Sequence, residues 1–513
     1  MCHNTIKRLL IIIEKNKHYL TKILYMSFCF VAFCLGIYLR YSDIDKLPLR
    51  FNEIHTAAFT SFEIQEIIPT IKKYDVHPPL YYLQLRLWRL FGHTDRWLRL
   101  NSVVWGMIGV LLIWFVAKGL FQDNMTALGA VVLFSVNPSA VLQAMHARMY
   151  TMLMVLSLVS FYAMHKSLVA KNWKSSVVFS FLMSIATTVM SWSHGAGVVI
   201  FLSIGLYIIY YAFFNRITVL RLFSIYFFLG ISFLTTIPLL KRGQEKIIVH
   251  GLVPQISDIL EAFAGMLVGT QQDYFHLLLW VISVVSVCFI LIAVYYKNRE
   301  SLAIIFAFIV SPMALFIIMS YVIKPMWISY SLSWMIPFLC LAISSILFPP
   351  IPMGSKKIST KYMRIVGFCV LLLVCTFQAY FAQKQKTNMA NLDFPSAIHF
   401  VKEKSHPTDI IIPVSSLFWG WFRYWVGPEH QVPIALGQYK KSGEPLIIAQ
   451  ISENKITPNR NYWVIFRTAC RQFDLNDIIN LMNRNEIRIQ EEYVFDRLSV
   501  IKLSNYKTMQ VIK

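Results

Sequence analysis

The residues with the clearest chemical potential lie in one polar stretch, residues 40–101, between two strongly apolar segments. Asn52 and Glu53 stand side by side within it, and Asp75-Val76-His77-Pro78-Pro79 lies between two segments, 61–73 and 81–92, with the helical spacing of apolar residues that is typical of the membrane surface. Each proline fixes its own φ and restricts the residue before it, so this second motif predicts a stiff turn. Ionisable groups near a bilayer are costly and usually functional. The stretch therefore predicts a head-group site at the membrane boundary, with candidates Asn52, Glu53, Asp75 and His77.

Similar residues recur where later apolar segments begin or end. In chain order they are His146, Arg148, Tyr150, His194, Lys241, Arg242 and Lys324. If successive segments cross a membrane alternately, all of them lie on the same face as residues 40–101. Chance placement would scatter such groups between the two faces, so we expect these segments to converge on one site.

The elements that must position these residues are membrane-spanning helices. The 513 residues are 57% hydrophobic and only 14% charged, with a mean hydropathy of +0.55, whereas a soluble protein is about half apolar and about a quarter charged. Eleven apolar windows approach the length that spans a bilayer, and they cover about 22–39, 102–120, 125–143, 149–165, 176–193, 196–214, 220–239, 276–296, 301–322, 327–348 and 363–381. The sequence therefore predicts a polytopic α-helical membrane protein.

The loop charges predict an orientation. Alternate short loops carry lysine and arginine and almost no acids, as around Lys171, Arg216 and Lys357. Basic loops remain in the cytoplasm. The basic residues 1–21 are then a cytoplasmic N-terminus, and an odd number of spans places everything after about residue 384 outside. This charge pattern and the lack of a disulfide-type cysteine spacing indicate a multi-pass protein of a bacterial plasma (inner) membrane.

The C-terminal part, residues 385–513, has a different character. Residues 409–414, 462–468 and 496–503 have the β-branched and aromatic content of strands, and the sequences FPSAIHFVKEK and DLNDIINLMNRN have helical periodicity. Alternating elements of this kind predict a small soluble α/β domain. It carries no catalytic motif and is interpreted as a lid or acceptor-docking module outside the membrane.

Several ordered motifs resemble a known family. LPLRFNEIHTA, HPPLYYLQLRLWRLFG, RWLRLNSVVWG, ARMYTM and SWSHGAGVVI are similar to those of membrane glycosyltransferases with the GT-C fold, in the group of bacterial protein-mannosyltransferase-like and aminoarabinose-transferase-like enzymes. The resemblance covers roughly residues 20 to 385. It implies a GT-C-like transmembrane domain at 22–384, with residues 40–101 as its amphipathic first external loop.

The resemblance also implies a reaction and its partners. The donor is a sugar on a polyprenyl phosphate, and the acceptor is a glycolipid, a polysaccharide or a protein. A carboxylate of the first external loop activates the acceptor hydroxyl, attack at the anomeric carbon expels the lipid phosphate, and cations stabilise that phosphate. His77, Arg148, Tyr150, His194, Lys241, Arg242 and Lys324 are the expected substrate-binding residues.

The sequence departs from the family at its catalytic position. The family carries Asp-Glu where this chain has Asn52-Glu53, and asparagine cannot take a proton at neutral pH, although it can orient a hydroxyl. His146 stands where relatives often carry an acid, and Ser329 stands where they often carry an arginine. Glu53, Asp75 or His146 could then serve as the base. Alternatively, the chain is a degenerate homologue that binds lipid-linked sugar without turnover.

Other classes of function fit the sequence less well. A transporter of lipid-linked substrates would place ionisable groups near the middle of the bilayer in repeated halves, and neither feature is visible. No recognition motif accompanies the net charge of +22, so no nucleic acid is expected as a partner. Glu53, His55, His77 and His146 could in principle gather around a divalent metal, but their spacing matches no ligand motif, and we expect no certain cofactor.

Overall fold

A computed structural model describes residues 23, 25–45, 49, 51–246, 253–269, 299–323, 327–349, 357–389, 394–406, 409–413, 461–467, 487–495 and 498–505. The described residues fall into two compact units. The first comprises those of Met1–Ile44 and Ile71–Thr387, and the second those of Asp45–Thr70 and Asn388–Lys513. The boundary therefore passes through the predicted first external loop, and each unit is considered by itself.

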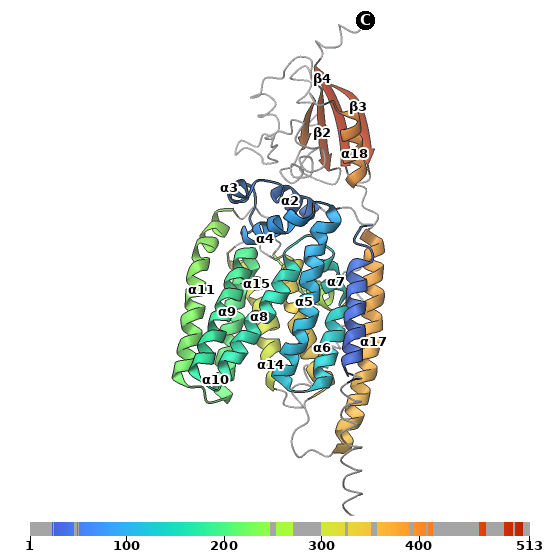
Figure 1. Ribbon diagram of the computed structural model, residues 1–513. Coiled ribbons are helices and arrows are strands. Elements are labelled where there is room, and N and C mark those ends of the chain that lie inside the picture. The colour runs from blue at the N-terminus through green and yellow to red at the C-terminus, as the bar shows by residue number, and fades with distance from the viewer. Residues whose placement is uncertain are drawn as a thin grey trace, which may run out of the picture. The chain divides into compact units, whose positions relative to one another are not determined.

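The first unit is a bundle of long apolar helices lying side by side (Figure 1). Among the described residues, eight helical stretches are long and apolar enough to cross a membrane. They are α5 (Asp95–Phe121), α8 (Tyr150–Leu168), α9 (Trp173–Ser193), η2 with α10 (Gly195–Val199 and Ile200–Phe214), α11 (Val219–Lys246), the run of α14, η3 and α15 (Arg299–Ile305, Phe306–Val310 and Ser311–Val322), η4 with α16 (Ser329–Met335 and Ile336–Leu347) and α17 (Lys357–Met389).

Three of the eleven predicted spans are not among these eight stretches. The helix Tyr25–Tyr41 is apolar but shorter than the others, and α6 (Asn124–Val136) and α7 (Pro138–Ala144) are long and apolar enough to cross only as a pair, with a bend of 57° between them. The window 276–296 lies outside the described residues. The polytopic helical class is confirmed, and the total of eleven spans stays a prediction.

The bend between α6 and α7 has a clear local cause. Pro138 has no N–H and cannot continue the α6 hydrogen bonds, but it suits the first position of a new helix. The Asn137 side chain caps α7 by accepting from the Ala140 N–H at 2.9 Å. Arg40, fully buried in the helix Tyr25–Tyr41, donates to the carbonyls of Phe134 and Ser135 at 3.0 and 2.7 Å, at the end of α6.

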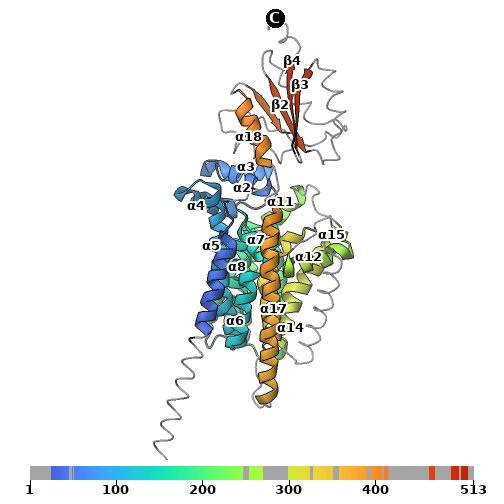
Figure 2. The same cartoon turned by 90° about the vertical axis from the view of Figure 1, so that its right-hand side faces the viewer.

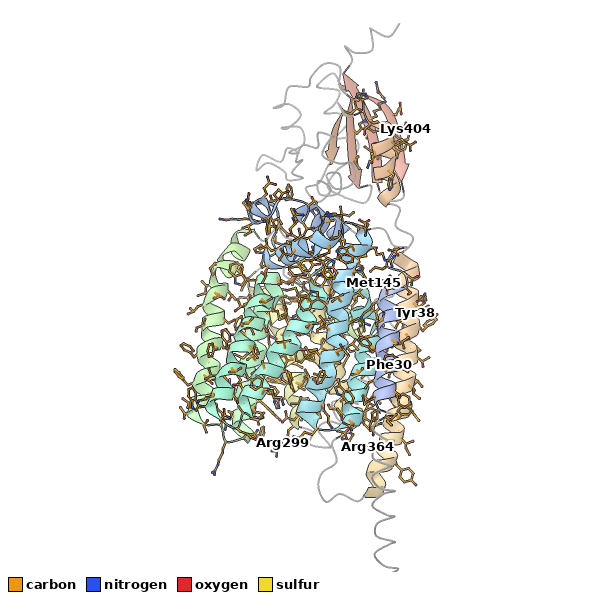
Figure 3. All side chains as sticks on the ribbon, in the orientation of Figure 1. Phe30, Tyr38, Met145, Arg299, Arg364 and Lys404 are labelled. Atoms are coloured by element: carbon orange, nitrogen blue, oxygen red, sulfur yellow. The ribbon has the colours of Figure 1, made fainter. Side chains whose placement is uncertain are left out.

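Short helices lie at one end of this bundle. α4 (Leu80–Trp88) continues into η1 (Arg89–Phe91) and lies at the end where α7 also lies (Figures 1 and 2). α3 (Ile64–Tyr74) precedes it, and α12 (Ile256–Val268) packs on α7 and η4. Figure 3 places Met145, just after α7, at that end, and Arg299 and Arg364 at the opposite end. Within the predicted amphipathic first loop, residues 64–74 and 80–91 are thus helical.

The second unit contains α2 (Phe51–Phe59) and a small α/β part. Its sheet has the order β1-β2-β4-β3, with β1 (Ile410–Pro413) parallel to β2 (Tyr462–Arg467) and the β2–β4 and β4–β3 pairs antiparallel. β4 is Leu498–Asn505, β3 is Ile487–Phe495, and α18 (Phe394–Lys404) packs on these two strands. The predicted α/β class of the C-terminal part is confirmed. β3 was not predicted, and the expected helix DLNDIINLMNRN lies outside the described residues.

Candidate active site at one end of the bundle

The predicted stiff turn is organised around Asp75. Its Oδ1 accepts hydrogen bonds from the backbone N–H groups of Val76 and His77, at 2.7 and 3.1 Å. Pro78 and Pro79 are buried and lead directly into α4. Tyr82, fully buried on the first turns of α4, donates its hydroxyl to Asp75 Oδ2. Both carboxylate oxygens therefore hold the turn and the helix together.

The charge state of Asp75 follows from these contacts. Burial alone would raise the pKa of Asp75, but electrostatic attraction to His77 and Arg148, the Tyr82 hydroxyl and the His77 backbone N–H outweigh it. The net result is a pKa below the usual aspartate value. Since a general base works best with a pKa near the operating pH, Asp75 is a poor base and a good anchor for a cation.

That cation is Arg148, in the tight turn between α7 and α8. The Arg148 N–H donates to the His146 carbonyl at 2.7 Å, and Ser102 on α5 donates to the Arg148 carbonyl at 3.2 Å. The guanidinium is buried, donates to the Tyr82 hydroxyl at 3.4 Å and lies 6.0 Å from the Tyr150 ring centre. Burial opposes its charge, but the oxygens of Tyr82, Tyr150 and Asp75 outweigh burial and raise the pKa of Arg148. The site therefore keeps a permanent buried positive charge.

Aromatic and imidazole rings form the rest of the cluster. His77 stacks on His194, with ring centres 4.7 Å apart, and His194 lies 5.7 Å from the Tyr150 ring. Tyr330, at the start of η4, packs edge-on against Tyr150 at 5.6 Å. Four separate segments therefore meet at this end of the bundle, as the sequence predicted for Asp75, His77, Arg148, Tyr150 and His194.

His194 reaches this position because the chain reverses tightly after α9. The Gly197 N–H donates to the His194 carbonyl at 2.8 Å. A Cβ at Gly197 would lie 2.6 Å from the Met190 carbonyl oxygen, so only glycine fits this reversal. Glycine at 197 thus allows the tight reversal that directly follows His194.

The remaining predicted residues have other placements. His146 is buried in the same turn as Arg148. Asn52 is exposed and Glu53 is 1% exposed, both on α2 of the second unit, so their position relative to Arg148 stays a prediction. Lys241 and Arg242 lie on α11 with side chains outside the described part, and Lys324 lies wholly outside it.

Tyr82 and Tyr330 are site residues that the sequence alone did not single out. Tyr82 stands in the HPPLYY motif, seven residues after Asp75, and Tyr330 follows Ser329, where the family often carries an arginine. Tyrosine at a membrane boundary is more often an interfacial anchor. Only the hydrogen bond to Asp75 and the contact with Tyr150 distinguish these two from ordinary anchors.

Within the described ranges, no three histidine, cysteine or carboxylate side chains gather closely enough to hold an ion. The four residues considered for such a site are divided between the two units, with Glu53 and His55 in one and His77 and His146 in the other.

The comparisons with known proteins concern the fold. No protein-family profile matches the sequence, and no curated protein matches it. The structure is similar to that of ArnT from Cupriavidus metallidurans, at 12% identity over 95% of this chain and 98% of that chain, with a TM-score of 0.58. A second structure of this ArnT, bound to undecaprenyl phosphate, gives a TM-score of 0.56 at 12% identity, over 94% of this chain and 97% of that one.

A more distant likeness points to the same architecture. The oligosaccharyltransferase of Archaeoglobus fulgidus matches at 10% identity, over 88% of this chain and 70% of that one, with a TM-score of 0.51. At these identities the likeness establishes the fold. The chain is a multi-pass membrane protein with the GT-C fold, as the sequence motifs indicated.

Proposed function

We propose that this protein transfers a sugar from a polyprenyl-phosphate carrier to an acceptor at the outer face of the membrane. The observation that carries the proposal is Arg148, a buried guanidinium held by Tyr82 and Asp75 at one end of a GT-C bundle. A buried arginine suits a phosphate group, because its planar fork can donate two parallel hydrogen bonds. The ArnT of this fold was crystallised with undecaprenyl phosphate, a ligand of this class.

The site residues divide the work as follows. Arg148 binds the carrier phosphate and stabilises the negative charge that grows on it as the glycosidic bond breaks. Asp75 and Tyr82 position Arg148, since the low pKa of Asp75 makes it a poor proton acceptor. Lys241, Arg242 and Lys324 are further proposed contacts of the carrier phosphate or the sugar. Tyr150 forms the aromatic wall on which the guanidinium lies.

The general base is assigned to Glu53, because Asn52 cannot take a proton and Asp75 is a poor proton acceptor. A base takes the proton of the acceptor hydroxyl while its oxygen attacks the anomeric carbon. The bond from that carbon to the phosphate oxygen breaks, and the polyprenyl phosphate leaves, with inversion at the sugar. Glu53 is a carboxylate of the first loop, Asn52 beside it can orient the hydroxyl, and His146 is the alternative base.

The proposed topology follows the charges. Basic residues such as Arg299 and Arg364 lie at the end of the bundle opposite Met145 (Figure 3), which favours a cytoplasmic location for that end. The Arg148 cluster would then face outward, the N-terminus would be cytoplasmic, and the C-terminal α/β part would be outside. That part is a candidate lid or docking module for the acceptor.

The test is donor turnover by the purified protein in lipid nanodiscs. A panel of polyprenyl-phosphate sugars is offered, and released polyprenyl phosphate is measured for wild type, Asn52→Asp, Glu53→Gln and Glu66→Gln. Glu66 is an exposed acid on α3 and serves as the matched control. Turnover that survives in Glu66→Gln and disappears in Glu53→Gln supports the proposal.

Two other outcomes have a definite meaning. Turnover by Asn52→Asp alone would identify a homologue that has lost its chemistry and kept its site, as the departure at Asn52 suggests. If neither the wild type nor Asn52→Asp turns over a donor, and vesicle assays show that the intact lipid-linked sugar moves across the membrane, the protein is a transporter. That result would refute the proposed transferase activity.

A further inference from the structure

The tautomer of His194 is determined by its backbone surroundings. His194 caps the short helix η2, and the Ala196 N–H donates to His194 Nδ1 at 3.0 Å. A nitrogen that accepts a hydrogen bond carries no proton, so in the neutral imidazole the hydrogen is on Nε2. The ring therefore presents one N–H donor, and its direction is set by the cap.

That donor is buried and donates no hydrogen bond to any described residue. His194 is 5% exposed, and its Nε2 has no hydrogen-bond partner among the described residues. Buried polar groups almost always have a partner, because an unsatisfied donor is costly. The His77 ring and the Tyr150 ring pack against the imidazole and hold it in place. The structure thus holds the Nε2–H donor in a fixed position, although a buried donor without a partner costs folding free energy.

The charges around His194 favour an anionic ligand that accepts a hydrogen bond from Nε2–H and leaves the proton on the imidazole. Burial, followed by repulsion from His77 and Arg148, lowers the pKa of His194 well below its usual value, so the ring is neutral at pH 7. Arg148 lies over the same Tyr150 ring that His194 contacts. A permanent cation and a neutral N–H donor that both lie against one aromatic ring suit an anion with several acceptor oxygens.

We propose that the Nε2–H of His194 donates a hydrogen bond to a phosphate oxygen of the polyprenyl-phosphate carrier, as a second phosphate contact beside Arg148. The inference rests on the proposed function and deepens it by assigning an atom and a tautomer. His194 supplies direction and no charge, whereas Arg148 supplies the charge.

Two substitutions separate the donor from the cap. His194→Asn keeps an oxygen near the position of Nδ1 and remains a good helix cap, but it removes the Nε2–H. His194→Gln places an amide N–H near the position of Nε2 and loses the cap. The experiment measures binding of undecaprenyl phosphate, and of undecaprenol as the phosphate-free probe, to the full-length protein in phosphatidylcholine nanodiscs. Size-exclusion profiles confirm that each variant remains folded.

The expected result is selective for phosphate. His194→Asn should weaken undecaprenyl phosphate binding about tenfold to a hundredfold, the value of a hydrogen bond to a charged group, and leave undecaprenol binding unchanged. His194→Gln should retain more of the phosphate binding than His194→Asn. Equal binding of undecaprenyl phosphate by wild type and His194→Asn would overturn the inference and leave an ordered water or a purely structural cap as the role of Nε2.

The remaining outcomes distinguish this inference from the proposed function. Inorganic phosphate alone binding as tightly as undecaprenyl phosphate would identify a site for free phosphate and overturn the lipid assignment. Undecaprenyl phosphate binding that depends on His194, without turnover of any donor, would support the inference and refute the transferase. Absence of binding by the wild type would overturn both.

Discussion

Arg40 offers the sharpest test of how the bundle is built. The last four carbonyls of an α-helix have no partner within the helix. Two of those at the end of α6, on Phe134 and Ser135, accept from Arg40 at 3.0 and 2.7 Å, and a third bond runs to the Gly36 carbonyl at 3.1 Å. Arg40 is 0% exposed, so water cannot replace these contacts. We expect Arg40→Lys to destabilise the fold.

The magnitude follows from the geometry of the two side chains. Lysine keeps the buried positive charge but has a single nitrogen, which cannot reproduce the planar fork that serves two carbonyls. At least one charge-assisted hydrogen bond is lost, worth about 1.5–3 kcal/mol. This corresponds to a change of roughly tenfold to a hundredfold in the unfolding equilibrium constant.

The assay is equilibrium unfolding in mixed micelles, followed by tryptophan fluorescence. Arg96→Lys is the matched control, because Arg96 is exposed and its guanidinium lies over the exposed Tyr41 ring, so its effect should be about 0.5 kcal/mol or less. Gly106→Ala is an independent probe, since its Cβ would lie 3.1 Å from Arg40 Nε and 3.2 Å from the Ala144 Cβ. Arg40→Lys unfolding at the same midpoint as Arg96→Lys would refute the reasoning.

The other predictions concern the Arg148 cluster. Arg148→Lys should raise the KM for the lipid-linked donor about tenfold or more, because lysine loses the bidentate phosphate contact; an unchanged KM in steady-state turnover would remove Arg148 from the donor site. Gly197→Ala should destabilise the protein by about 1–3 kcal/mol through its clash with the Met190 carbonyl, whereas Gly195→Ala, which meets nothing within 4 Å, should be near neutral in the same unfolding assay. The folded pKa of Asp75 is lower than the unfolded value of about 3.9. The stability contributed by its carboxylate is therefore complete above about pH 4 and is lost as the pH falls through the folded value. Asp75→Asn should flatten that part of the profile of unfolding midpoint against pH, and an unaltered profile would contradict it.

Much of the fold can be predicted from the sequence, because the helices and their ends are determined by residues within one segment. Spanning helices follow from the length and composition of apolar windows, and several helix starts follow from their caps. The side chains of Thr94, Asp123 and Asn172 each accept a backbone N–H at the start of a spanning or bent helix. The stiffness of the Asp75–Pro79 turn follows from its two prolines in the same way.

The sequence also determined which residues could form a site, since ionisable groups at the ends of apolar segments are costly without a role. It could not decide what each of them does. Asp75 could have been a base, and our proposal that it positions Arg148 rests on the hydrogen bonds that its carboxylate accepts from Tyr82 and from two backbone N–H groups. The stack of His77 on His194 depends on a contact between segments far apart in the chain, and so does the burial of His194 Nε2, which has no hydrogen-bond partner among the described residues.

Arg40 is a second residue whose role was decided by the tertiary structure and not by the sequence. Long basic side chains near helix ends usually reach toward water, and Arg40 stands at the end of the helix Tyr25–Tyr41. The tertiary structure instead buries it against the open carbonyls of α6, which become available only where Pro138 interrupts the helix. Composition and periodicity act within one segment and can be read from it. Pairing of a buried charge with its acceptors is decided only when separate helices pack.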